Sequence, residues 1–305
     1  MDVRLHVRYR IHHRTAYEYA SDVLHAHHLL HLVPRPAPFQ QCLEHTIKVE
    51  PATFRRRDEI DAFGNALTHI EFEHPHRRLE VVAQMDVDVH PRPKISSDHS
   101  TPWERLCADL SYHGVWPTRD NLEACRFRHE SPYVRVKQEF TDYSQECFAQ
   151  DRPILACADA LMVKLHRDLK YAKGETTVRT PLRQILKNRR GVCQDFSHLM
   201  IACLRSRGLA ARYVSGYLRA GPIRSAERAA SLAVGAGASH AWVAVYTPPF
   251  GWLEFDPTNN TRVGTDHVAV AWGRDFGDVS PLHGVVLGGA THELSVSVSV
   301  EPIIQ

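Results

Sequence analysis

The chain has 305 residues, of which 43% are hydrophobic and 24% charged, close to the values of ordinary soluble globular proteins. Its 37 basic and 35 acidic residues give a net charge of +2, which excludes a strong overall field that would attract nucleic acid or an anionic membrane surface. We therefore expect neither partner. A chain of this length exceeds one ordinary small core, so the sequence predicts two domains.

Targeting signals and cysteine usage indicate a cellular compartment. The first residues alternate and carry charges, so they lack the apolar core of a secretory signal peptide. No stretch approaches the roughly 18 apolar residues that a membrane-spanning helix needs. The seven cysteines are odd in number and scattered, without a CxxC pair, which is typical of reduced thiols. These features predict a cytoplasmic protein.

The chain divides into four segments by its patterns. Residues 1–95 alternate apolar and charged side chains between turn signals, which predicts a β-rich N-terminal domain. Residues 96–150 carry helical periodicity and are expected to connect it to a second domain over 151–290. The Gly-, Ala- and Ser-rich stretch 220–239 is expected to form a loop. The alternation in 291–305 predicts a C-terminal strand that joins a sheet, preferably the N-terminal one, to bury Val296, Val298 and Val300.

The helix predicted over 193–207 begins at Cys193, and Gly208 is expected to cap its C-terminus. A helix N-terminus offers unpaired N–H groups and the positive end of the dipole, which favour a thiolate. The same N–H groups can bind an oxyanion. The position therefore suits an activated nucleophile, although an ordinary core cysteine would satisfy the same pattern.

A predicted hairpin supplies the partners of a nucleophile. Strands are expected over 211–218, 241–246 and 252–255, and His240 stands immediately before the second of them. Asp256 shares a face with His240. If Trp252 pairs with Tyr246, Asp256 lies diagonal to His240; a two-residue change of register places it directly opposite. Either register permits a base and its orienting carboxylate, and either is compatible with a surface pair without a joint role.

Together these segments resemble the transglutaminase-like core. The motifs that carry the resemblance are 191–198 (GVCQDFSH), 211–217 (ARYVSGY), 239–243 (SHAWV) and 252–258 (WLEFDPT). The resemblance is to the bacterial branch, whose members include transglutaminase-like enzymes and candidate cysteine proteases with a β-rich N-terminal region. It implies an α+β fold, in which a papain-like cysteine helix packs on an antiparallel sheet.

The resemblance also implies catalytic roles. Cys193, His240 and Asp256 match the catalytic positions of the family, which implies cysteine-dependent acyl transfer on a carboxamide or peptide bond of a peptide or protein through a thioester. Protease, amidase and transamidase activity use the same triad. The Cys193 N–H is one expected oxyanion donor, and Tyr171 and Gln184 are candidates for the second. No acidic loop has calcium-binding spacing, so no cofactor is expected.

Two other readings remain open. The fold can also serve as a catalytically silent peptide-binding module. A metalloprotein is suggested by the 21 histidines, four of which cluster at His25, His27, His28 and His31. In a strand, His25 and His27 would face away from His28, and no zinc-binding spacing occurs, so we expect no metal site.

Overall fold

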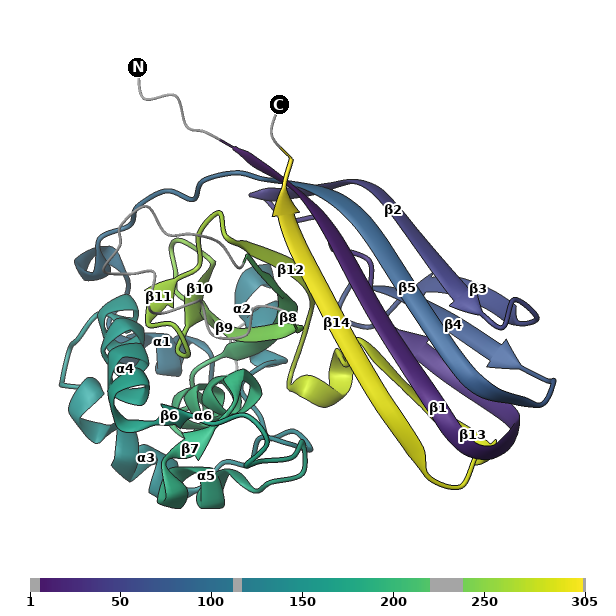
Figure 1. Ribbon diagram of the computed structural model, residues 1–305. Coiled ribbons are helices and arrows are strands. Elements are labelled where there is room, and N and C mark those ends of the chain that lie inside the picture. The colour runs from purple at the N-terminus through teal and green to yellow at the C-terminus, as the bar shows by residue number, and fades with distance from the viewer. Residues whose placement is uncertain (1–5, 112–116, 220–237, 304–305) are drawn as a thin grey trace, which may run out of the picture.

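The computed structural model describes residues 6–111, 117–219 and 238–303, and it consists of two antiparallel sheets with a group of helices on one side (Figure 1). The expected loop at 220–239 lies almost entirely outside the described residues. The mixed architecture confirms the α+β class and the β-rich N-terminal region. No helix within the described ranges is long and apolar enough to cross a membrane.

The N-terminal region folds into a curled sheet built around one long strand. Neighbouring strands run in the order β2-β5-β1-β4-β3. The alternation of apolar and charged residues places Tyr9 and Ile11 of β1 in the core, whereas Arg10 points outward to Asp86. The strands are β1 (Val7–Leu30), β2 (Gln40–Glu50), β3 (Arg55–Ile60), β4 (Ala66–Phe72) and β5 (His76–Val89).

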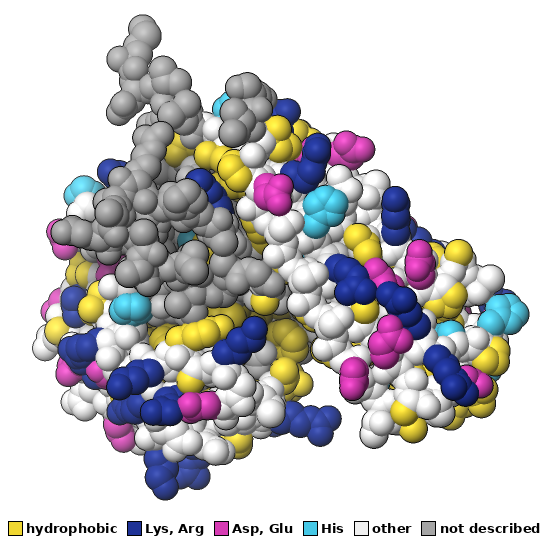
Figure 2. Space-filling model, in the orientation of Figure 1, with side chains coloured by type: hydrophobic (Ala, Val, Ile, Leu, Met, Phe, Trp, Pro, Cys, Tyr) yellow, Lys and Arg dark blue, Asp and Glu magenta, His cyan; other side chains and the backbone are white. Residues whose placement is uncertain are grey.

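The outer face of this sheet carries charges of both signs. Arg8 pairs with Asp88, Arg14 with Glu80, and Arg10 with Asp86, all across the β1–β5 pair. Figure 2 shows basic and acidic side chains interspersed over this half of the molecule. Such a ladder is typical of a solvated sheet face.

The two last strands return to the N-terminal sheet. Strands β13 (Leu282–Gly288) and β14 (His292–Pro302) both pair antiparallel with β1, with Val300 opposite Ile11. The expected C-terminal strand is therefore present and lies in the expected sheet. The predicted boundary at 290 groups β13 with the catalytic segment, whereas β13 pairs with β1.

The burial of the tail differs from the expectation. Val298 and Val300 are half-buried and pack against the core, but Val296 is 42% exposed. This difference arises because β14 pairs with β1 alone among the described strands and so lies at an edge of the sheet.

Helices form most of the segment between the two sheets. In the described part of the expected helical connection over 96–150 the helices are all short, whereas α4 and α6 are longer and amphipathic. Their bounds are η1 (Ser97–His99), α1 (Trp103–Asp109), α2 (Arg119–Cys125), α3 (Gln138–Ser144), η2 (Gln145–Cys147), α4 (Ile154–Asp168), α5 (Leu182–Asn188), α6 (Cys193–Arg205) and η3 (Phe276–Asp278).

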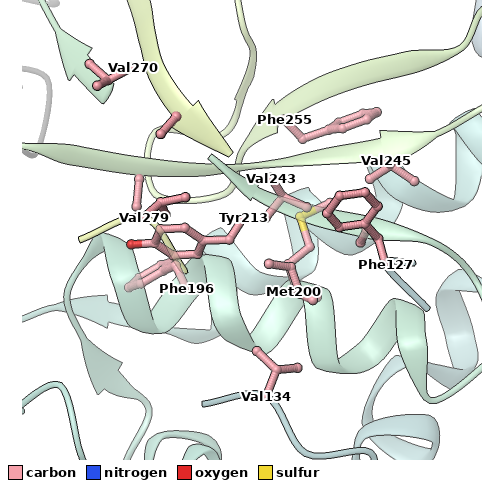
Figure 3. Packing of buried hydrophobic residues seen from close by; sticks show 14 of the residues in the cluster. Phe127, Val134, Phe196, Met200, Tyr213, Val243, Val245, Phe255, Val270 and Val279 are labelled. Carbon is pink, nitrogen blue, oxygen red and sulfur yellow. The ribbon is translucent and has the colours of Figure 1, made fainter. Parts of the chain in front are cut away.

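The second sheet supports the cysteine helix. Its order is β11-β10-β9-β8-β12, and α6 packs on β8 and β9. Figure 3 shows Phe196 and Met200 of α6 beside Tyr213 and Val243, in the apolar layer that joins helix to sheet. The strands are β8 (Ala211–Leu218), β9 (His240–Tyr246), β10 (Trp252–Asp256), β11 (Thr261–Arg262) and β12 (His267–Gly273), and a separate parallel pair is β6 (Lys170–Tyr171) with β7 (Arg190–Gly191).

Side-chain amides from the N-terminal region close the edge of β12. The Gln40 amide donates to Ala269 O and accepts from Ala269 N, both at 2.7 Å. Asn65 makes the same two bonds to the backbone of Trp272, at 2.9 and 3.0 Å. The amides replace a neighbouring strand, so the edge of the second sheet is hydrogen-bonded to the N-terminal region.

We expect β14 to contribute to the stability of the whole protein. Deletion of residues 291–305 should lower the melting temperature markedly, because it removes the half-buried valines and leaves one side of β1 unpaired. Thermal unfolding followed by circular dichroism measures this. As a finer test, Val298→Ser should cost about 1 kcal/mol of unfolding free energy, whereas Ser297→Ala on the outer face should cost little. An unchanged melting temperature after the deletion would contradict the pairing.

Candidate active site

Cys193 occupies the first turn of α6, which is held in place by Asp195. The Asp195 carboxylate accepts hydrogen bonds from Val192 N at 2.8 Å and from Thr176 Oγ1 at 2.7 Å. It lies over Gly191, where a Cβ atom would come within 2.7 Å of it. The glycine before the cysteine is therefore required by close approach. Cys193 itself is half-buried and a free thiol.

The environment of Cys193 differs from that of the buried cysteines. Burial raises the pKa of the Cys157 thiol to about 12 and raises the pKa of Cys147 and Cys203, which keeps these thiols protonated. Cys42 is half-buried like Cys193, but it lies in a β-strand and burial raises its pKa as well. Cys193 alone of these five is the first residue of an α-helix, at the positive end of the helix dipole.

The hairpin of β9 and β10 brings His240 and Asp256 together. Trp252 pairs with Tyr246 and Phe255 with Val243, which selects the diagonal one of the two expected registers. His240 Nε2 lies 2.7 Å from Asp256 Oδ2, and both side chains are fully buried. Since an ionised carboxylate can only accept hydrogen bonds, Nε2 carries the proton and donates a hydrogen bond to Asp256. The bond leaves Nδ1 as the basic nitrogen.

The His240 imidazole faces both the carboxylate and the thiol. Burial opposes its charged form, but attraction and hydrogen bonding to Asp256, with a further interaction with the Cys193 thiol, raise the pKa of His240 well above its ordinary value. His240 Nδ1 is buried and makes no hydrogen bond of ordinary geometry to any residue in the described ranges. It is the nitrogen available to the thiol, and such contacts often tighten only when substrate binds. His240 can therefore act as the base that takes a proton from the thiol.

Asp256 is kept ionised by several donors. Burial favours its neutral form, but the His240 imidazole, followed by His267, lowers the pKa of Asp256 well below its ordinary value. Oδ1 accepts from the backbone N–H groups of Thr258 at 3.0 Å and Asn259 at 3.2 Å. Oδ2 accepts from the Asn259 side chain at 2.7 Å. This turn fixes the carboxylate that orients His240.

Asn259 and His267 were not predicted from the sequence as donors to Asp256. Asp256 and Asn259 form a local turn, a pattern that Asp-Pro-Thr-Asn favours and that could have been recognised. His267 lies 11 residues beyond Asp256 and has no local signal, because its position depends on β12 pairing with β8. Its Nε2 lies 3.2 Å from Asp256 Oδ2.

The two candidates for the second oxyanion donor differ in position. Tyr171 pairs with Gly191 in the β6–β7 ladder, two residues before Cys193. Partial burial, followed by the charge of Cys193, raises the pKa of the Tyr171 hydroxyl, although the residue remains 38% exposed. Gln184 lies exposed on α5. The structure therefore places Tyr171 on the strand that pairs with the residues just before Cys193, whereas no contact among the described residues joins Gln184 to the nucleophile.

The four histidines at 25–31 lie in different environments, and His25 and His27 face away from His28 as the strand pattern predicted. His25 and His27 are exposed, His28 is buried on the opposite face of β1, and His31 binds Ser280 O and Asp61. Among the described residues, one group of three has ligand atoms within 4.8 Å of one another: His240, Asp256 and His267. The direct 2.7 Å bond between His240 and Asp256 accounts for this grouping without an ion.

Known proteins share both halves of the chain. Residues 9–88 match the bacterial transglutaminase-like N-terminal region, and residues 141–257 match the transglutaminase-like superfamily. An uncharacterised protein of Mycobacterium tuberculosis is 35% identical over 303 residues, covering 97% of this chain and 93% of its own. The chain therefore belongs to the bacterial transglutaminase-like family.

Further relatives cover the fold and part of the sequence. The crystal structure of a candidate cysteine protease from Cytophaga hutchinsonii superposes with a TM-score of 0.74, covering 99% of this chain and 92% of its own at 17% identity, and so shares the fold. A protein-glutamine gamma-glutamyltransferase of Pseudomonas aeruginosa is 29% identical over 164 residues, which are 53% of this chain and 21% of that protein.

The buried ion pair predicts a characteristic pH dependence of stability. The raised pKa of His240 contributes stability that is complete below its unfolded pKa of about 6.5 and is lost as pH rises through the folded value. The lowered pKa of Asp256 contributes stability that is complete above about pH 4 and is lost as pH falls through the folded value. Denaturant unfolding at a series of pH values should therefore separate wild type from Asp256→Asn most widely between about pH 4 and 6.5.

A matched control is Asp98→Asn, which removes an exposed carboxylate from η1. Its difference from wild type should be small at every pH. A wild-type advantage over Asp256→Asn that did not vary with pH would contradict the ion pair.

Proposed function

We propose that the protein is a cysteine-dependent enzyme that transfers the acyl group of a carboxamide or peptide bond through a thioester on Cys193. The observation that carries this proposal is the buried bond from His240 Nε2 to Asp256, which leaves Nδ1 as a base beside a cysteine at a helix N-terminus. This is the geometry of a nucleophile, a base and an orienting carboxylate.

The first half of the reaction forms the thioester. His240 Nδ1 takes the proton of the Cys193 thiol, and the sulfur attacks the carbonyl carbon of the substrate. The negative charge that develops on the carbonyl oxygen is stabilised by the Cys193 backbone N–H and by the Tyr171 hydroxyl. When the tetrahedral intermediate collapses, the carbon–nitrogen bond breaks and the amine leaves with the proton from His240.

The second half releases the acyl group. His240 removes a proton from an acceptor, which attacks the thioester carbon, and the sulfur leaves as thiolate. Water as acceptor gives hydrolysis, and an amine gives transamidation. Asp256 stabilises the imidazolium in both halves without taking its proton. The reaction needs no metal or organic cofactor in this proposal.

Peptides or proteins are the proposed substrates. One similar protein is named a protein-glutamine gamma-glutamyltransferase and another a candidate cysteine protease. The names of relatives therefore include both acyl transfer to an amine and cleavage of a peptide bond. A silent peptide-binding module is less favoured, because all three triad side chains are present and two of them are joined in the buried core. The cytoplasmic location expected from the sequence stays a prediction.

Product analysis tests this proposal. Mass spectrometry of a glutamine- and lysine-containing peptide library should reveal cleavage, deamidation or cross-linking by wild type. Cys193→Ala and His240→Ala should abolish the product, and Asp256→Asn should lower the rate by up to about 10⁴, as in a known triad. Cys42→Ala, which removes another half-buried thiol, should retain activity. Full turnover by Cys193→Ala would exclude the mechanism.

A further inference from the structure

We propose that His267 is a positioning residue, which holds Asp256 in the orientation that His240 requires and transmits the support of the N-terminal sheet to the triad. The inference deepens the proposed function and rests on it for its catalytic meaning. Its structural part, a second histidine bound to the orienting carboxylate, concerns the resting protein and can be measured without turnover.

The contact to Asp256 is direct and buried. His267 Nε2 lies 3.2 Å from Asp256 Oδ2, the same oxygen that accepts from His240 at 2.7 Å and from Asn259 Nδ2 at 2.7 Å. His267 is only 4% exposed. With three donors on one oxygen, a rotation of the carboxylate that served His240 less well would also break its bonds to the other two donors.

The environment of His267 identifies its proton-carrying nitrogen. Nδ1 is buried and has no hydrogen-bond partner in the described parts of the chain. A proton on Nδ1 would leave a buried donor unsatisfied, which costs about 1–3 kcal/mol, whereas a proton on Nε2 is donated to a carboxylate. His267 therefore donates to Asp256 through Nε2–H. The imidazolium of the site resides on His240.

The ring of His267 is held in one orientation by its neighbours. Trp242 packs edge-on against it, with centroids 5.2 Å apart and planes at 79°. Gly216 of β8 permits this packing, because a Cβ atom there would lie 2.5 Å from the Trp242 ring and 2.2 Å from Val268 O. Gly216 also pairs with His240 on one side and Ala269 on the other. A side chain at this glycine would separate the two histidine-bearing strands.

The N-terminal sheet holds the strand that carries His267. The preceding residue, Asp266, accepts a hydrogen bond from Tyr9 of β1 at 3.3 Å. Two residues after His267, the backbone N–H and C=O groups of Ala269 are both hydrogen-bonded to the side chain of Gln40 of β2. Gln40 is itself buried and also donates to Arg35 O at 2.9 Å. His267 therefore lies between two anchors on the N-terminal sheet, which gives that sheet a part in the geometry of the site.

Four variants separate this role from simple packing. His267→Phe keeps an aromatic ring against Trp242 but removes both nitrogens, and His267→Gln restores an N–H donor. Gln40→Leu removes the anchor on Ala269 without touching the triad. The matched control is His28→Phe, because His28 is a similarly buried histidine, 3% exposed, in the N-terminal sheet and away from the site.

Two measurements apply to each variant. Nitrogen-15 NMR of protein labelled at histidine reports the tautomer of each ring and the exchange of the His240 Nε2 proton with solvent. Steady-state kinetics on a peptide substrate separates kcat from KM. We expect wild-type His267 to carry a proton on Nε2, hydrogen-bonded to Asp256. His267→Phe should accelerate exchange of the His240 proton and lower kcat by about 10- to 100-fold with little change in KM, the usual range for groups that orient a functional histidine.

The remaining variants complete the test. His267→Gln should recover most of kcat, Gln40→Leu should show a smaller loss of the same kind, and His28→Phe should match wild type. Wild-type kcat and proton exchange in His267→Phe would overturn the positioning role. If His267→Phe fails to fold, a low kcat in a folded His267→Gln overturns it instead. Equal behaviour of Gln40→Leu and His28→Phe would overturn the part assigned to the N-terminal sheet. If wild type has no peptide turnover, the NMR result alone decides the inference and the proposed function fails separately.

Discussion

The hydrogen bond between His240 and Asp256 is the interaction on which the rest of the site depends. Both side chains are fully buried, and an unpaired charge in the protein interior would be very costly. The pair is therefore stable only if strand register, turn and neighbouring donors keep its two members together. The raised pKa of the imidazole and the lowered pKa of the carboxylate are both consequences of that constraint.

The two halves of the chain form one structure around this constraint. The strands β13 and β14 return to β1 after the catalytic sheet is complete, so the N-terminal sheet contains both ends of the described chain. Gln40 and Asn65 close the exposed edge of the catalytic sheet with amide hydrogen bonds. This connection offers a physical reason for the N-terminal region to accompany the catalytic core, since that core would otherwise have an unpaired edge beside the residues that hold Asp256.

Much of this arrangement follows from local sequence patterns. Helical spacing placed Cys193 at a helix start, and strand alternation placed His240 and Asp256 on one face, because both patterns depend on neighbours within a few residues. The register of the hairpin remained open between two alternatives, since either buries the same apolar side chains. The alternation at 294–300 predicted a strand and favoured the sheet that it joins.

What sequence reasoning missed depends on long-range pairing. β13 contacts β1 across more than 250 residues, so the boundary predicted at 290 grouped it with the catalytic segment. The exposure of Val296 follows from the edge position of β14, which no local pattern specifies. Asp256 lies on β10 and His267 on β12, which flank the β8–β9 pair on opposite sides. Their contact depends on the folded sheet, so no local pattern in the sequence indicates it.

The most direct test of the account is to trap the acyl group on the enzyme. The protein is mixed with an activated peptide ester, quenched in acid within seconds, and analysed by intact mass and by peptide mapping. We predict one acyl group on the peptide that contains Cys193, removable by hydroxylamine as a thioester, and absent from Cys193→Ser and His240→Ala. Acylation of another residue at the wild-type rate in Cys193→Ser would contradict the central claim that Cys193 is the nucleophile.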